Sequence, residues 1–86
     1  MEKIYKYGPV PSWNSKDSLQ VPGRIVKCGL QAGEIGREIF VWAIQDSENE
    51  EINISHLKYY PTGYEFDGDY IDTVFTGPFV WHIIRN

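Results

Sequence analysis

The last apolar segment of the chain, residues 79–84, strongly limits what this protein can fold into. Its letters are FVWHII, and in an extended strand alternate side chains point to opposite sides. The two sets are Phe79, Trp81 and Ile83 on one side and Val80, His82 and Ile84 on the other. Both sides are mostly apolar, yet the chain has only 86 residues and no segment with the pattern of a long helix. Either another part of the chain or a second copy therefore has to cover the second side.

Most of the remaining chain carries the signals of short strands and turns. The segments expected to be strands are residues 3–8, 18–21, 24–31, 39–46, 52–60, 70–76 and 78–84. Residues 39–44 are all apolar, which is typical of a strand covered on both sides, and residues 32–38 are expected to be a hairpin connection. We therefore predict a single all-β domain over residues 1–86. It is a small sandwich or partly open barrel of about six or seven short antiparallel strands, with little or no helix.

Composition excludes several classes of protein. The single cysteine, Cys28, cannot form an intramolecular disulfide, and one thiol with two distant histidines makes no zinc site, so no metal or cofactor is expected. No apolar run reaches the length of a membrane span, and the first residues do not have the pattern of a signal peptide, so a reducing cytoplasm is the expected location. The net charge of −4 argues against long nucleic acid but leaves room for a small anionic ligand held by a few local cations.

The sequence has no familiar catalytic constellation, and we expect the protein not to be an enzyme. Cys28 and His82 are the one conceivable nucleophile and base, but Cys28 lies among apolar residues, where a thiol is usually inert packing. The acidic segment 67–72 superficially resembles a calcium loop, yet it lacks the terminal Glu and the other oxygen ligands of such a loop. A solvated turn is the better interpretation of that segment.

Two features favour binding. Tyr59, Tyr60 and Tyr64 flank the tripeptide PTG, in which Thr62 offers a hydroxyl and Gly63 allows close approach of the backbone to a ligand. The alternative is an ordinary turn supported by tyrosines. The second feature is a set of isolated cations on or next to the expected strands, which either bind an anion or keep strand edges from aggregating. These cations are Arg24, Lys27, Arg37 and Lys58.

Several short segments, taken in order, carry a resemblance to a known family. They are IYKY near the start, VWAIQD in the middle, a Thr-Gly loop, and then YIDTVF and FVWHII. In this order they resemble a large family of short phage and prophage proteins. Members of that family carry a turn-forming Thr-Gly pair ahead of the last hairpin, and Thr62-Gly63 stands in that place. The surrounding letters, YYPTGYEF, are this chain's own version of the loop.

The resemblance implies a function in immune evasion. Small β-rich phage proteins of this size include nucleotide sponges, which are oligomers that bind the cyclic dinucleotide signals of the anti-phage CBASS systems without hydrolysing them. By this resemblance the protein is similar to an anti-CBASS sponge that binds a signal such as 3′,3′-cyclic GMP–AMP in the cytoplasm of the infected bacterial host. Two alternatives stay open: direct binding to a host defence protein, and a small hydrolase of the signal.

A sponge needs aromatic rings on which the bases stack and hydrogen-bond donors for the phosphates. We choose the expected site residues by these two requirements. The predicted ligand-binding residues are Trp13, Arg37, Tyr60, Thr62, Gly63 and Tyr64. We also predict that Val80, His82 and Ile84, or the opposite set, meet the same surface of a second copy in a dimer or tetramer, because symmetric contacts are the commonest way in which small proteins associate.

Overall fold

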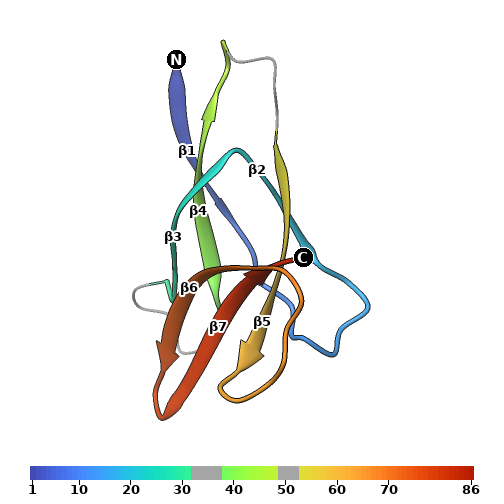
Figure 1. Ribbon diagram of the computed structural model, residues 1–86. Helices are drawn as coiled ribbons and strands as arrows, with labels where there is room; N and C mark the ends of the chain where they lie inside the picture. The colour runs from blue at the N-terminus through green and yellow to red at the C-terminus, as the bar shows by residue number, and fades with distance from the viewer. Residues whose placement is uncertain (32–37, 49–52) are drawn as a thin grey trace.

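The structure is a computed structural model that describes residues 1–31, 38–48 and 53–86. These residues form seven strands and no helix (Figure 1). The strands are β1 (Glu2–Tyr7), β2 (Leu19–Pro22), β3 (Arg24–Gly29), β4 (Phe40–Asp46), β5 (Ile54–Pro61), β6 (Asp69–Thr76) and β7 (Phe79–Arg85). The all-β prediction is confirmed, and the strand ends differ from the expected ones by only one or two residues. The expected hairpin connection lies largely outside the described residues.

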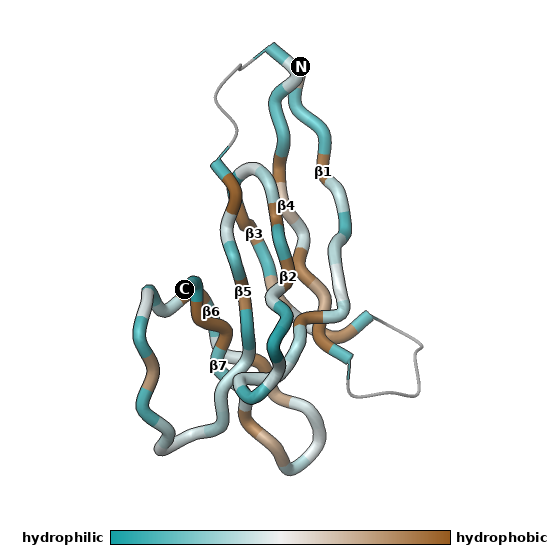
Figure 2. The backbone as a smooth tube through the Cα atoms, turned by 90° about the vertical axis from the view of Figure 1, so that its right-hand side faces the viewer, coloured by the Kyte–Doolittle hydropathy of each residue, from teal (hydrophilic) through white to brown (hydrophobic). Residues whose placement is uncertain are grey.

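The strands form two antiparallel sheets, one with the order β1-β4-β3 and one with the order β2-β5-β7-β6. Figure 2 shows β6 and β7 on one side of the molecule and β1 on the other, so the architecture is an open sandwich. The chain passes from the second sheet to the first at Gly23, between β2 and β3. Gly23 has φ +90°, and a Cβ atom there would lie 2.3 Å from the carbonyl oxygen of Ile44. Only glycine suits this corner, because it tolerates positive φ and leaves room for the neighbouring strand.

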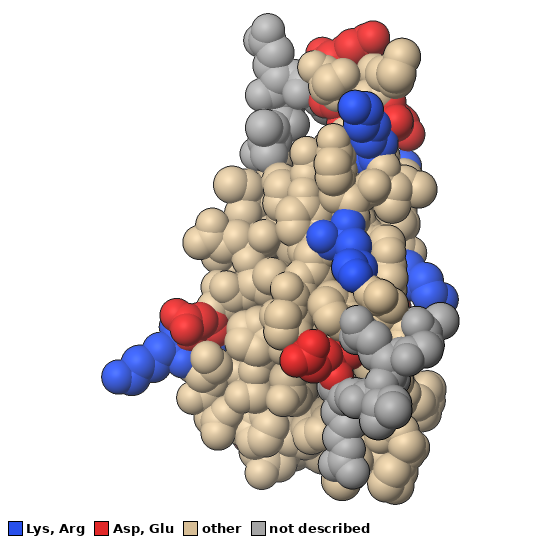
Figure 3. Space-filling view, turned by 180° about the vertical axis from the view of Figure 1, so that it is seen from behind, with Lys and Arg blue, Asp and Glu red and all other residues tan. Residues whose placement is uncertain are grey.

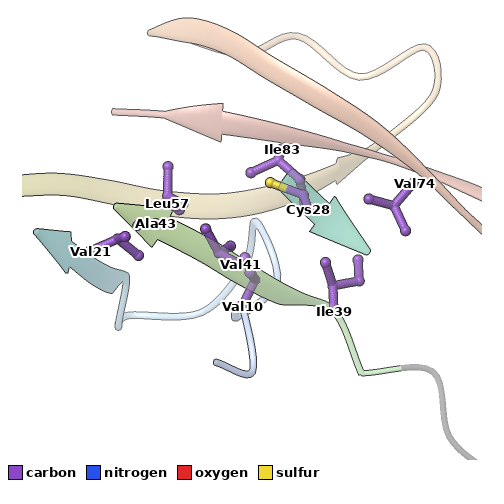
Figure 4. Packing of buried hydrophobic residues seen from close by; sticks show 9 residues of the cluster. All are labelled: Val10, Val21, Cys28, Ile39, Val41, Ala43, Leu57, Val74 and Ile83. Carbon is purple, nitrogen blue, oxygen red and sulfur yellow. The ribbon is translucent and has the colours of Figure 1, made fainter. Parts of the chain in front are cut away.

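The core lies between the two sheets and consists of small aliphatic side chains (Figure 4). Its members are Val10, Val21, Cys28, Ile39, Val41, Ala43, Leu57, Val74 and Ile83. Burying each valine, leucine or isoleucine fully contributes about 1.5–3 kcal/mol, so this cluster supplies most of the stability of a chain this small. Burial raises the pKa of the Cys28 thiol to about 12, with a smaller contribution from the charge of Asp72. The interpretation of Cys28 as packing is confirmed.

Both sides of β7 are covered by its own chain near the C-terminus. Ile83 faces the core and Ile84 the outer side of the four-stranded sheet, and each has 0% of its surface exposed. The loop that follows β5, residues 62–68, lies on that outer side, away from the three-stranded sheet (Figure 2). Its end is fastened where Asn86 Nδ2 donates to the carbonyl oxygen of Asp67 at 2.7 Å. Association of two copies stays a prediction, but Ile84 has no exposed surface to offer to it.

The second side of β4 is covered in a different way. Val41 and Ala43 face the core, whereas Trp42 faces outward and is half-buried. Lys6 on β1 and Lys27 on β3 lie opposite Trp42 on the two neighbouring strands. Their aliphatic stems can cover an apolar surface while the ammonium groups stay in water. Figure 3 shows basic side chains spaced along this side of the molecule.

Among the described residues, no helix is long and apolar enough to cross a membrane.

Candidate binding sites

A small pocket lies on the outer side of the four-stranded sheet, under the loop after β5. We call it the aromatic pocket, and its volume is about 180 Å³. It is lined by Tyr60, Pro61, Gly63, Tyr64, Phe66, Tyr70 and His82. The strand β5 ends at Pro61, where a turn closed by the backbone N–H of Tyr64 sends the chain out over the sheet. Gly63 has φ +89° and open space where a Cβ would stand, so this turn needs glycine for its backbone conformation.

A chain of hydrogen bonds crosses the floor of the aromatic pocket. His82 Nε2 bonds with Thr62 Oγ1 at 2.8 Å, and His82 Nδ1 bonds with Thr73 Oγ1 at 3.0 Å. The hydroxyl of Tyr70 bonds with the same Thr73 Oγ1 at 2.6 Å. Both ring nitrogens of His82 are therefore satisfied on the outer side of the sheet, while Cys28 lies in the core on the other side. The conceivable pair of Cys28 and His82 is not formed.

Trp13 packs against the outside of the pocket wall. Its ring centroid lies 5.3 Å from that of Tyr64 in an edge-on arrangement and 6.2 Å from that of Trp81 in a stacked one. Tyr59 also contacts Trp81, with the ring centroids 4.9 Å apart. Trp13 reaches this place because the backbone N–H of Tyr59 donates to the carbonyl oxygen of Pro11 at 3.0 Å. The loop that carries Trp13 is thereby tied to the edge of β5.

The charges near the aromatic pocket are acidic. Glu65, Asp67 and Asp69 are exposed on or beside its loop, and Arg85 pairs with Asp69 at 3.0 Å. No lysine or arginine within the described ranges lines the pocket. Within the same ranges, no group of three or more His, Cys, Asp or Glu residues is arranged to hold a metal ion.

A much larger hollow opens between the two sheets, at the end where β1 and β4 extend beyond β6 and β7 (Figure 1). We call it the inter-sheet groove, and its volume is about 1140 Å³. Both sheets contribute to it, with Tyr5 and Ile25 on one side and Ser55 and Ile71 on the other. Tyr70 lines both the inter-sheet groove and the aromatic pocket.

The lining of the inter-sheet groove contains both paired and unpaired charges. The amino group of Met1 lies 3.0 Å from Asp46 and 3.3 Å from Glu48. This contact with Asp46 raises the pKa of the amino group, and a hydrogen bond from the backbone of Glu48, together with the amino group, lowers the pKa of Asp46. Lys3 and Arg24 also line the groove, and neither has an ion-pair partner in the described part of the chain. The groove therefore offers two cations without an ion-pair partner, beside the carboxylate of Glu2.

A comparison with known families decides where this chain belongs. A family described as "Domain of unknown function (DUF7352)" matches residues 1–86. The chain belongs to the DUF7352 family. No curated protein and no solved structure matches it. Since the family description names no activity, the function of this DUF7352 protein has to be argued from its two hollows.

The structure of the DUF7352 chain brings together most of the predicted ligand-binding residues. Tyr60, Gly63 and Tyr64 line the aromatic pocket, Thr62 holds its histidine, and Trp13 supports Tyr64 from outside. Arg37 lies outside the described residues.

Sequence reasoning assigned His82 to an interface between copies and did not recognise it as part of this pocket. One signal was available, because Thr62 precedes the last hairpin and Thr73 lies within its first strand. The inter-sheet groove was missed entirely, since its residues come from segments that are far apart in the sequence.

Proposed function

We propose that this DUF7352 protein is a phage-encoded, non-catalytic binding protein that sequesters a cyclic dinucleotide signal in the cytoplasm of the infected host, as an anti-CBASS sponge does. The observation that carries the proposal is the inter-sheet groove with its unpaired Lys3 and Arg24. Its volume of about 1140 Å³ matches or exceeds the roughly 300–1,000 Å³ of typical ligand pockets. The aromatic pocket is below that range and no described lysine or arginine lines it, so the groove suits a molecule with two bases and two phosphates better.

The proposed contacts follow from the chemistry of the groove lining. Lys3 and Arg24 each donate charge-assisted hydrogen bonds to a phosphate, and Tyr5 and Tyr70 present ring faces on which bases stack. Each stacked base contributes roughly 1–3 kcal/mol and each charged hydrogen bond about 1.5–3 kcal/mol. Two of each give about 5–12 kcal/mol, from which the cost of association of at least about 4 kcal/mol is subtracted. Nanomolar affinity needs about 12 kcal/mol net, so we include a dimer or tetramer in which two copies share the ligand.

Calorimetric titration with 3′,3′-cyclic GMP–AMP tests this proposal. We expect stoichiometric binding with fewer than one ligand per chain, and recovery of the intact nucleotide afterwards. Arg24→Gln should weaken binding about 10- to 100-fold, because it removes one charge-assisted contact. Lys27→Gln is the matched control, since Lys27 is an exposed cation on the same strand that does not line the groove.

Other outcomes of the same titration have defined meanings. Absence of heat with any cyclic dinucleotide overturns the sponge proposal. Cleaved nucleotide favours the hydrolase alternative. If Tyr64→Ala weakens binding while Arg24→Gln has no more effect than the control, the predicted loop residues and not the groove hold the ligand.

Direct binding to a host defence protein is the second candidate, and one observation favours it. Large apolar side chains are exposed on the outer side of the four-stranded sheet and its loop, notably Phe66, Tyr70 and Phe75. Contiguous exposed apolar surface often marks a protein interface. Alanine substitution of Phe75 should abolish capture of the host target if this candidate holds, and should leave nucleotide binding unchanged if the sponge proposal holds.

A further inference from the structure

We propose that the aromatic pocket is a second binding site, distinct from the inter-sheet groove, and that it takes a methylated ammonium group of the kind found in choline or trimethyllysine. Four aromatic rings contribute to its lining, from Tyr60, Tyr64, Phe66 and Tyr70. The rings of Tyr60 and Phe66 are tilted by 54° with centroids 6.3 Å apart, so they form two walls and not a closed stack. Ring faces attract cations electrostatically, and cages of several rings recognise quaternary ammonium groups.

The hydrogen-bonding groups of the pocket lining narrow the choice of ligand. Both ring nitrogens of His82 are engaged by threonines, and the hydroxyl of Tyr70 is engaged by Thr73. The hydroxyl of Tyr60 lies 3.5 Å from Asn86 Nδ2. The lining offers no carboxylate and no free ring nitrogen as an acceptor, so a primary ammonium, a guanidinium or the edge of a base replaces its hydrogen bonds to water less fully here. A trimethylammonium group carries a positive charge and no donor, so it loses no hydrogen bond on entry.

The charges around the pocket point to a cation. Glu65 and Asp67 are exposed on the pocket's own loop, while Arg85 is paired with Asp69 at 3.0 Å. No lysine or arginine of the described chain lines the pocket to oppose a positive ligand. These carboxylates add a long-range attraction that a neutral ligand of the same shape would not feel.

The dimensions of the pocket agree with such a ligand. Its volume of about 180 Å³ is below the roughly 300–1,000 Å³ of pockets that take drug-sized ligands. That space suits a compact head group and excludes a whole dinucleotide. Tyr64 and Phe66 are each about half-exposed at the rim, so the remainder of a longer ligand can extend into solvent.

An NMR titration with choline and with its neutral isostere 3,3-dimethylbutan-1-ol tests the proposal on the full chain. We expect choline to shift the amide signals of Gly63, Tyr64 and Phe66 saturably, and the isostere to bind about tenfold more weakly because it lacks the charge. Equal or tighter binding of the isostere would show a plain apolar pocket and overturn the proposal. Absence of shifts with choline would overturn it as well.

Paired variants give the site its controls. Phe66→Ala removes one wall and should weaken choline binding about tenfold or more, whereas Phe75→Ala alters an exposed aromatic residue that does not line the pocket and should have no effect. If Phe66→Ala disturbs the loop, Glu65→Gln provides a milder test, with a loss of about two- to fivefold and no change in binding of the isostere. An unchanged affinity for choline in both Phe66→Ala and Glu65→Gln would contradict the assignment.

Two natural sources carry this chemistry, and they can be separated. A trimethyllysine peptide has no anion beside its ammonium group, whereas the phosphocholine head group of a lipid vesicle brings a phosphate close to Glu65 and Asp67. We expect the peptide to bind more tightly than phosphocholine vesicles by at least about threefold. Arg24→Gln should leave both unchanged, so failure of the proposed nucleotide site and failure of this site are distinguishable.

Discussion

The inter-sheet groove and the aromatic pocket are both built on the four-stranded sheet, and Tyr70 contributes to each, yet they differ in volume and in the charges of their lining. The groove is large, and its lining combines the carboxylates of Glu2, Asp46 and Glu48 with two cations, Lys3 and Arg24, that have no ion-pair partner among the described residues. The aromatic pocket is small and lies under a loop that carries acidic residues, and its His82 nitrogens and Tyr70 hydroxyl are already hydrogen-bonded. Aromatic content alone therefore does not identify a nucleotide site in this chain. Charge and the availability of free donors separate the two hollows more sharply than ring count does.

The largest expected effect concerns Ile84, because its side chain has no exposed surface. It lies on the same side of the four-stranded sheet as the loop that builds the aromatic pocket. Ile84→Asp places a carboxylate at a position with no exposed surface, and we expect a loss of more than about 4 kcal/mol in the free energy of unfolding. Circular dichroism should show an unfolded or aggregated chain, because a chain this small has only about 4–13 kcal/mol of stability. Phe75→Asp, on the same outer side but 69% exposed, is the control and should stay folded. A folded, monomeric Ile84→Asp variant would instead support the interface role.

The second-largest expected effect is that a variant of each hollow loses binding of one ligand and keeps binding of the other. Arg24→Glu should weaken binding of the cyclic dinucleotide about 100-fold, since it replaces an attraction by a repulsion, and should leave choline binding unchanged. Phe66→Ala should do the reverse, with about a tenfold loss for choline only. Calorimetry of both ligands on both variants provides the measurement. If either variant affects both ligands equally, the two hollows act as one site through Tyr70.

A smaller effect is expected on the free energy of unfolding, where Thr73 at the floor of the aromatic pocket should contribute more than Thr62 at its rim. Thr73→Val removes the hydroxyl that bonds with both His82 and Tyr70, and we expect a loss of about 1–2 kcal/mol in the free energy of unfolding. Thr62→Val removes one bond at an exposed position and should cost less, about 0.5 kcal/mol. Urea unfolding followed by tryptophan fluorescence measures both. Equal losses would mean that the network is not organised around the half-buried Thr73.

The smallest effect concerns the charges at the inter-sheet groove. The raised pKa of the Met1 amino group stabilises the folded state fully below its ordinary value of 8.0, and this contribution disappears as pH rises through the folded-state pKa. The lowered pKa of Asp46 stabilises above its ordinary value of 3.8, and this contribution disappears as pH falls through the folded-state pKa. Asp46→Asn should therefore lower the melting temperature slightly between about pH 4 and 8 and not outside that window. The same variant frees the amino group and should strengthen nucleotide binding in the groove; weaker binding would contradict an anion site there.

Much of the architecture was predictable from local patterns. Alternation of side chains and the glycine and proline turn signals locate all seven strands within one or two residues, because both depend on the geometry of neighbouring residues only. The packing role of Cys28 followed from its apolar neighbours in the same way. Tyr60 and Tyr64, predicted as ligand contacts, both line the aromatic pocket because they belong to one turn and its flanks, whereas Tyr59 contacts Trp81.

The remaining features were decided by the tertiary structure. Lys3 and Arg24 line one groove because β1 and β3 pair with opposite edges of β4, where Lys3 lies opposite Gln45 and Arg24 opposite Ile44, and the sequence holds no local sign of that register. The partners of His82 and the cover over Ile84 depend on where residues 62–68 cross the sheet. That position is set by contacts of Asp67 and Asp69 with Asn86 and Arg85, which follow much later in the chain. Periodicity records which side of a strand a residue faces. What lies opposite that side depends on burial and pairing between distant segments, and only the folded chain determines it.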